Sequence, residues 1–156
     1  HHLLHCWSSL LPQDREILCG CRVSARREAR GERQESMAEF RFEKLEVWRK
    51  AMDWAKAIYQ VSRGFPDHER NGLTPQLRRA AVSVASNIAE GAGRTSDADF
   101  ARFLEIAYGS LMEATCQVRL AFELGYTDRD HIETLKEAAA EISRMLSGLR
   151  KYRKPR

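Results

Sequence analysis

The sequence is poor in residues that interrupt regular secondary structure, with four prolines and nine glycines among 156 residues. This composition disfavours a loop-rich or all-β chain, in which turns recur every few residues. Long apolar runs are also missing, since no stretch approaches the ~20 residues that a membrane-spanning helix requires. The segment LLHCWSSLL near the start lacks the basic residues that precede a secretory signal. We therefore expect a cytoplasmic protein with no membrane partner.

The sequence also lacks the short motifs that mark many active sites. It contains no Gly-rich phosphate loop and no GxSxG, HExxH or CxxC pattern. Glu90 and Glu113 are a carboxylate pair that could do acid–base work or hold a metal, but such a site usually needs a histidine as well. His68 falls in a predicted loop and His131 at the start of the last predicted helix, apart from both carboxylates. We therefore expect a non-enzymatic protein that uses no metal or cofactor.

Residues 1–36 differ in composition from the rest of the chain. They contain three of the four cysteines and three of the five histidines, but no lysine and no methionine. Helical periodicity begins only after Met37, so we expect residues 1–36 to be a disordered or non-native leader and residues 37–156 to be the folded domain. A metal site is the alternative interpretation, although its spacings fit no zinc-finger pattern. Its ligands would be His1, His2, His5, Cys6, Cys19 and Cys21.

Apolar residues recur every three or four positions in four later stretches, which is typical of amphipathic helices. The first predicted helix covers residues 43–63, and the second begins at Thr74 as N-cap and stops at Gly91 and Gly93. The third covers residues 97–124, and the fourth begins at Asp128 and continues into a basic C-terminal tail. Short connections between long helices predict an all-α fold, an antiparallel up-down-up-down four-helix bundle.

The apolar face of the first predicted helix is wider than the core of one bundle needs. It consists of two stripes, one with Trp48 and the other with Trp54. We expect one tryptophan to pack in the core and the other stripe to contact a second copy of the chain. The residues assigned to this oligomer interface are Val47, Trp54 and Ile58.

Polar residues at helical spacing on the second and third predicted helices suggest a buried network. Antiparallel packing could set Arg79 against Glu113, and Ser83 or Asn87 against Ser110. We interpret this set as a structural network that fixes the register of the two helices, because buried polar groups must satisfy one another. The predicted members are Arg79, Ser83, Asn87, Glu90, Ser110 and Glu113.

Basic residues are the other candidates for function. The net charge is +4 and the isoelectric point about 9.0, which is compatible with a polyanionic partner. The tail sequence RKYRKPR combines dense positive charge with one aromatic ring, a combination that suits phosphate contacts and base stacking. The predicted nucleic-acid-binding residues are Arg49, Lys50, Lys56, Arg78, Arg150, Lys151, Arg153 and Lys154. A protein-interaction scaffold with no nucleic-acid role is the alternative.

Three segments resemble a known family: FEKLEVWRKAMDWAKAIY, LRRAAVSVASNIAEGAGR and FARFLEIAYGSLMEATCQVRLAFELGY. This bacterial four-helix-bundle family includes proteins encoded by intervening sequences within 23S ribosomal RNA genes. It is also similar to the accessory variability protein of diversity-generating retroelements. The resemblance covers about residues 40–154, which is essentially the whole chain apart from the leader.

The resemblance implies a homopentameric barrel of antiparallel bundles. In the retroelement relatives, a basic barrel surface is associated with nucleic acid and with the reverse transcriptase, so RNA, DNA and a reverse transcriptase are the implied partners. The family pattern also marks a set of positions that we interpret as architectural. In this sequence they are Arg79, Ser83, Asn87, Glu90, Gly91, Gly109, Ser110 and Glu113.

Overall fold

The structure is a computed structural model that describes residues 39–152. The predictions for residues 1–36, and for Arg153 and Lys154 of the tail, lie outside the described residues. Four long helices dominate the described part: α1 (Glu46–Val61), α2 (Leu73–Ala92), α3 (Asp97–Glu123) and α4 (Arg129–Tyr152). Three short 3-10 helices are also present: η1 (Arg41–Lys44) precedes α1, and η2 (Ser62–Gly64) and η3 (Asp67–Asn71) connect α1 to α2.

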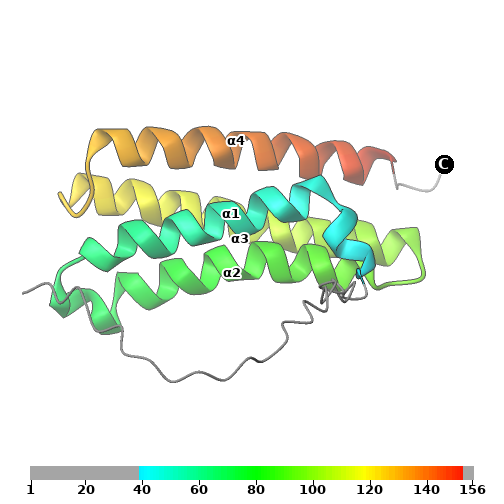
Figure 1. Cartoon of the computed structure of the whole chain (residues 1–156), viewed down its shortest axis with the longest axis horizontal. Helices are drawn as coiled ribbons and strands as arrows, with labels where there is room; N and C mark the ends of the chain where they lie inside the picture. The colour runs from blue at the N-terminus through cyan, green and yellow to red at the C-terminus, as the bar shows by residue number, and fades with distance from the viewer. Residues whose placement is uncertain (1–38, 153–156) are drawn as a thin grey trace, which may run out of the picture. The chain divides into compact units, whose positions relative to one another are not determined.

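Consecutive long helices run in opposite directions (Figure 1). Helix α1 packs against α2 and α4, and α3 packs against the same two helices, so the four form a closed ring around one core. The prediction of an antiparallel up-down-up-down four-helix bundle is therefore confirmed. Within residues 39–152, no helix combines the length and the apolar character that crossing a bilayer requires.

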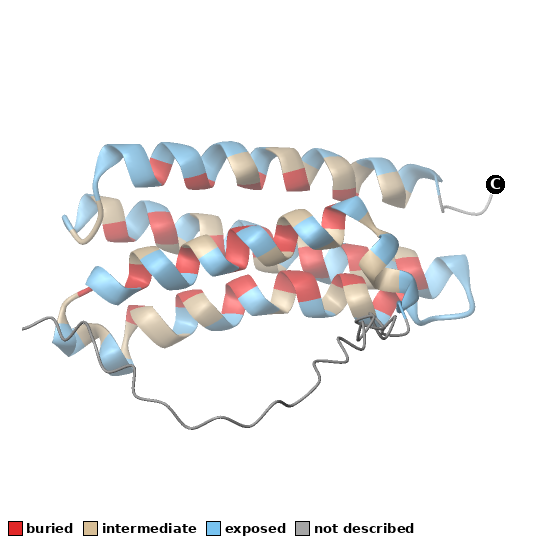
Figure 2. Cartoon of the chain, in the orientation of Figure 1, coloured by how far each residue is buried: buried red, intermediate tan, exposed pale blue. Residues whose placement is uncertain are grey.

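The core is formed by one buried stripe on each helix (Figure 2). On α3 this stripe follows the uninterrupted spacing of four and three residues that antiparallel packing requires. The buried residues of α3 are Phe100, Leu104, Ala107, Leu111, Ala114, Val118 and Ala121. A buried hydrogen bond also joins α1 to α4, because the indole Nε1 of Trp54 donates to the carbonyl oxygen of Leu135 over 2.9 Å.

Helices α2 and α3 approach each other closely near the end of α2. A Cβ atom added at Gly91 would lie 2.8 Å from both Phe100 Cδ2 and Phe103 Cβ, which is too close for any real side chain. Glycine at this position therefore allows the two aromatic side chains of α3 to pack directly on the α2 backbone. The predicted stop at Gly91 and Gly93 is confirmed for Gly93, which is the C-cap, and wrong for Gly91, since α2 continues to Ala92.

The helix starts show how far local signals determine the boundaries. Ser96 and Asp128 are the N-caps of α3 and α4, and each accepts a hydrogen bond from the backbone N–H three residues later. Ser96 Oγ accepts from Asp99 N–H over 3.0 Å, and Asp128 Oδ1 accepts from His131 N–H over 2.8 Å. The assignment of Thr74 as the N-cap of α2 is wrong, because the helix begins at Leu73. The carboxylate of Glu69, in η3, accepts from the Leu73 N–H over 2.6 Å and supplies the missing cap.

Candidate nucleic-acid interface

The structure corrects the predicted oligomer interface. Val47, Trp54 and Ile58 are 2%, 3% and 0% exposed, so they pack in the core of a single chain and present nothing to a partner. The periodicity showed two apolar stripes on α1 but could not show which one faces inward. The stripe with Trp48, Met52 and Tyr59 is the outer one.

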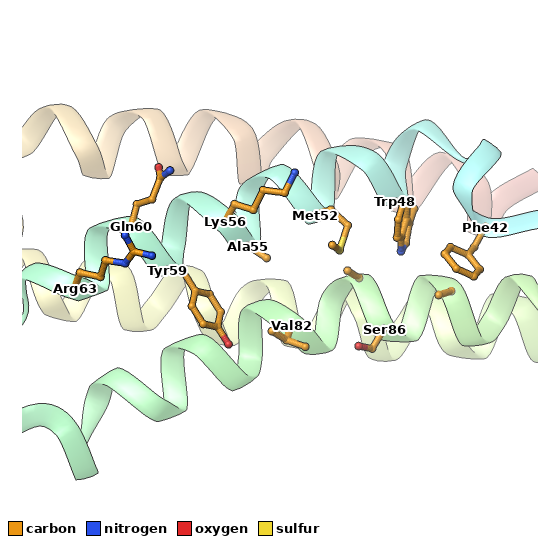
Figure 3. A pocket seen from close by; sticks show the side chains of 12 residues that line it. Phe42, Trp48, Met52, Ala55, Lys56, Tyr59, Gln60, Arg63, Val82 and Ser86 are labelled. Atoms are coloured by element: carbon orange, nitrogen blue, oxygen red, sulfur yellow. The ribbon is translucent and has the colours of Figure 1, made fainter. Parts of the chain in front are cut away.

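These outer residues line an elongated groove between α1 and α2 of about 630 Å³, here called the α1–α2 groove (Figure 3). Trp48, Met52 and Tyr59 of α1 point toward α2, where Val82 forms part of the opposite wall. Phe42, from η1, closes one end and packs edge-on against Trp48, with ring centroids 4.9 Å apart. The groove is largely apolar, and Lys56, Gln60 and Arg63 are the polar residues that α1 and η2 contribute to its lining.

Half of the predicted polar network lies between α2 and α3. Ser83 Oγ and Ser110 Oγ are 2.8 Å apart, and Asn87 Nδ2 donates to the carbonyl and hydroxyl oxygens of Ser83 over 2.7 and 3.0 Å. All three side chains are half-buried. Each hydrogen bond therefore replaces contacts that water would otherwise make, and the cluster links the two helices at one register.

The charged half of the predicted network lies elsewhere. Glu90 pairs with Arg94 on the surface, Glu113 accepts from Gln117 over 3.2 Å, and Arg79 is exposed. The predicted Arg79–Glu113 pair is absent from residues 39–152. Within the same range, neither Glu90 nor Glu113 pairs with a histidine. Within the same residues, no three His, Cys, Asp or Glu side chains are placed to hold a metal ion.

Most of the predicted nucleic-acid-binding residues on the helices have acidic partners. Lys50 Nζ lies 3.0 Å from Glu141 Oε1, and the hydrogen bond and charge of Glu141 raise the pKa of the Lys50 ammonium. Lys56 lies 2.9 Å from Asp53. Similar pairs join Arg49 to Glu39, over 3.8 Å, and Arg150 to Glu105, over 3.9 Å. These surface pairs add little stability, but they reduce the positive charge available to a phosphate.

The two predicted residues on the helices that have no acidic partner within residues 39–152 are Lys151 and Arg78. Lys151 is exposed at the end of α4, whereas Arg78 lies in a different environment. Arg78 lines a hollow of about 420 Å³ at the start of α2, here called the arginine hollow. Its Nε donates to Ser62 Oγ over 2.7 Å, and its guanidinium carbon lies 5.0 Å from the centroid of the Tyr59 ring. The arginine hollow is lined by Tyr59, Arg70, Thr74, Pro75, Arg78, Arg79 and Val82.

Three of these lining residues are arginines and, among the described residues, none is acidic. Glu69 precedes Arg70 in sequence, but its carboxylate is engaged by Leu73 N–H and, over 3.3 Å, by the hydroxyl of Tyr126. Burial and the charge of Glu69 raise the pKa of that tyrosine. Arg79 was predicted to join the polar network and Arg70 was not among the predicted residues, because tertiary packing decides which cations have acidic partners.

These observations define a class of protein: an antiparallel four-helix bundle with an apolar groove and an arginine-lined hollow on its surface. The family model described as 23S rRNA-intervening sequence protein matches residues 43–148, and the chain belongs to this family.

One similar solved structure is the crystal structure of a protein of unknown function from the S23 ribosomal protein family of Bacteroides thetaiotaomicron VPI-5482. It shares 24% sequence identity with this chain and aligns with a TM-score of 0.63. The alignment covers 67% of this chain and 98% of that one, so the similarity concerns the bundle as a whole. Comparison with curated protein sequences found no significant match.

Proposed function

We propose that this protein is a non-enzymatic, oligomeric nucleic-acid-binding protein of the cytoplasm. The main support is the arginine hollow, where Arg70, Arg78 and Arg79 gather with no acidic residue among the described lining residues. Phosphate backbones attract such clusters, because binding releases the counterions condensed on the nucleic acid. The family description names an intervening sequence of 23S rRNA, which makes structured RNA the first ligand to test.

The test is fluorescence anisotropy with a structured RNA and a DNA duplex at two salt concentrations. If the three arginines of the hollow neutralise three phosphates of a duplex, its affinity should fall about 40-fold between about 50 and 200 mM salt. In a parallel series, glutamate should replace chloride. This separates the release of cations from the nucleic acid from the competition of anions for the arginines. Absence of binding to both polymers at low salt would contradict the proposal.

A protein-interaction scaffold is the second candidate, and the α1–α2 groove favours it. Trp48, Met52 and Val82 leave apolar surface in the groove, and Val82 is 44% exposed. Such surfaces on single chains commonly bind other proteins. The partner proposed for this groove is a second copy of the chain, and the resemblance implies a pentamer. A reverse transcriptase is a further protein to test if the gene lies in a retroelement.

A further inference from the structure

We propose that the arginine hollow binds one unpaired nucleotide of a single-stranded nucleic acid. The phosphate contacts the arginines, and the sugar or base packs on the apolar wall of the hollow. This inference rests on the proposed nucleic-acid binding. It adds where the nucleic acid binds and that the bound nucleotide is unpaired. No other part of the bundle surface needs to contact the nucleic acid.

The aromatic contacts of the arginines distinguish this hollow from the rest of the described surface. Four arginines of residues 39–152 lie over aromatic rings, and three of them also have a carboxylate partner. These three pairs are Arg94 with Glu90, Arg119 with Glu123, and Arg150 with Glu105. The fourth, Arg78, is instead held by the neutral hydroxyl of Ser62. Its charge is therefore positioned by its neighbours without being neutralised by them.

This positioning favours phosphate binding. The Ser62 hydroxyl uses one guanidinium N–H of Arg78, and the Tyr59 ring covers one guanidinium face, so the other N–H groups remain available as donors. A guanidinium that is already oriented loses less conformational freedom when it binds a phosphate. Arg70 and Arg79 line the same hollow and, within the described residues, neither has an ion-pair partner.

The walls of the hollow indicate an unpaired nucleotide. Tyr59, Pro75 and Val82 line it beside the arginines, and Tyr59 and Val82 are 40% and 44% exposed. In a duplex the base faces are stacked on one another, and a protein surface reaches mainly phosphates and base edges. An unpaired base or its sugar can cover apolar side chains next to its own phosphate, and stacking adds affinity with little sequence preference.

The experiment compares a short unstructured single-stranded RNA, the same sequence as DNA, and the corresponding duplexes, by anisotropy on the full chain. We expect each single strand to bind more tightly than its duplex. Arg79→Ala should weaken single-strand binding about tenfold, as expected for the loss of one charged contact. The matched control is Arg144→Ala, which removes the same charge from an exposed arginine on α4 that has no ion-pair partner within residues 39–152, and it should change affinity less than twofold.

Three further variants test the site, and each is chosen to preserve the fold. Thr74→Glu places a carboxylate in the hollow at the first turn of α2, where the helix dipole tolerates it, and should abolish single-strand binding. Tyr59→Phe should bind like the wild type and Tyr59→Ala more weakly, because the ring and not its hydroxyl forms the wall. Circular dichroism melting should show that each variant remains folded.

The outcomes separate this inference from the proposed function. If Arg79→Ala and Arg144→Ala weaken binding equally, or if duplexes bind as tightly as single strands, the inference is wrong while salt-dependent binding still supports the proposed function. If no polymer binds at low salt, both are wrong. A strand preference that Thr74→Glu removes and Arg144→Ala retains would support the inference.

Discussion

Gly91 and Gly109 were both predicted to be architectural positions, yet the space around their backbones differs. A Cβ atom at Gly91 would collide with Phe100 and Phe103, whereas a Cβ atom at Gly109 would meet nothing within 4 Å. Both glycines lie inside helices, where glycine is less favourable than alanine. The packing of α2 on α3 therefore explains the first glycine, while the second has no such explanation within the described chain.

Substituting alanine at these two positions should change stability in opposite directions. Gly91→Ala should lower the free energy of unfolding by about 1–3 kcal/mol, because the bundle must separate or distort to admit the methyl group. Gly109→Ala should raise it by up to about 1 kcal/mol through helix propensity alone. Urea denaturation followed by circular dichroism measures both, and equal effects would contradict the packing argument.

At the scale of the element, the start of α4 depends on one aspartate. Asp128 accepts hydrogen bonds from His131 through both the backbone N–H, over 2.8 Å, and the ring Nδ1, over 2.7 Å. These two bonds, the backbone one first, hold the pKa of the Asp128 carboxyl below its ordinary value of 3.8. The part of the cap's contribution that depends on negative charge is therefore present only while this carboxyl is ionised.

The stability that Asp128 contributes should depend on pH with a definite sign. Because its folded pKa is lowered, the contribution is fully present above pH 3.8 and is lost as the pH falls through the folded pKa. Asp128→Asn should melt below the wild type at pH 6, and the difference should shrink below pH 3.8. Thermal melts across this range measure the difference, with Asp130→Asn as the control two positions further along, in the first turn of α4. A difference that stays constant down to pH 2 would contradict the role of ionisation.

Helix number and the buried stripes of α2, α3 and α4 could be predicted from the sequence, because both follow from local spacing. The start of α2 could not, since its cap comes from Glu69, outside the helix, and Thr74 offered a plausible local substitute. The face of α1 that enters the core was equally ambiguous. Trp48 and Trp54 have similar spacing to other apolar residues, and only the position of α4 decides that Trp54 is buried.

The candidate site was predicted less well for the same reason. A basic residue is visible in the sequence, but its acidic partner often comes from another helix, as Glu141 of α4 does for Lys50 of α1. Arg78 was among the predicted nucleic-acid-binding residues and lines the hollow, whereas Arg70 was not predicted and Arg79 was assigned to a different role. The charge that remains available is therefore a property of the packed molecule.

At the scale of the whole molecule, the α1–α2 groove should govern assembly. Light scattering of the full chain should give a multiple of its 17.9 kDa mass, with five copies as the expected state. Met52→Lys should reduce this mass, because it introduces a charge into the apolar groove. Met112→Lys is the matched control, since Met112 is 39% exposed on α3, outside the groove, and its substitution should leave the mass unchanged. A monomeric wild type at micromolar concentration would contradict the proposal.

Tyr59 and Val82 line both the α1–α2 groove and the arginine hollow, so the two surfaces share a wall. A partner in the groove that shifts the Tyr59 ring also shifts the guanidinium of Arg78 above it. Thermodynamic linkage then makes the effect reciprocal: whatever factor assembly applies to the affinity for nucleic acid, nucleic acid applies to assembly. Binding measured at one protein concentration would therefore report a mixture of two coupled equilibria, and repeating the measurement at several protein concentrations would separate them.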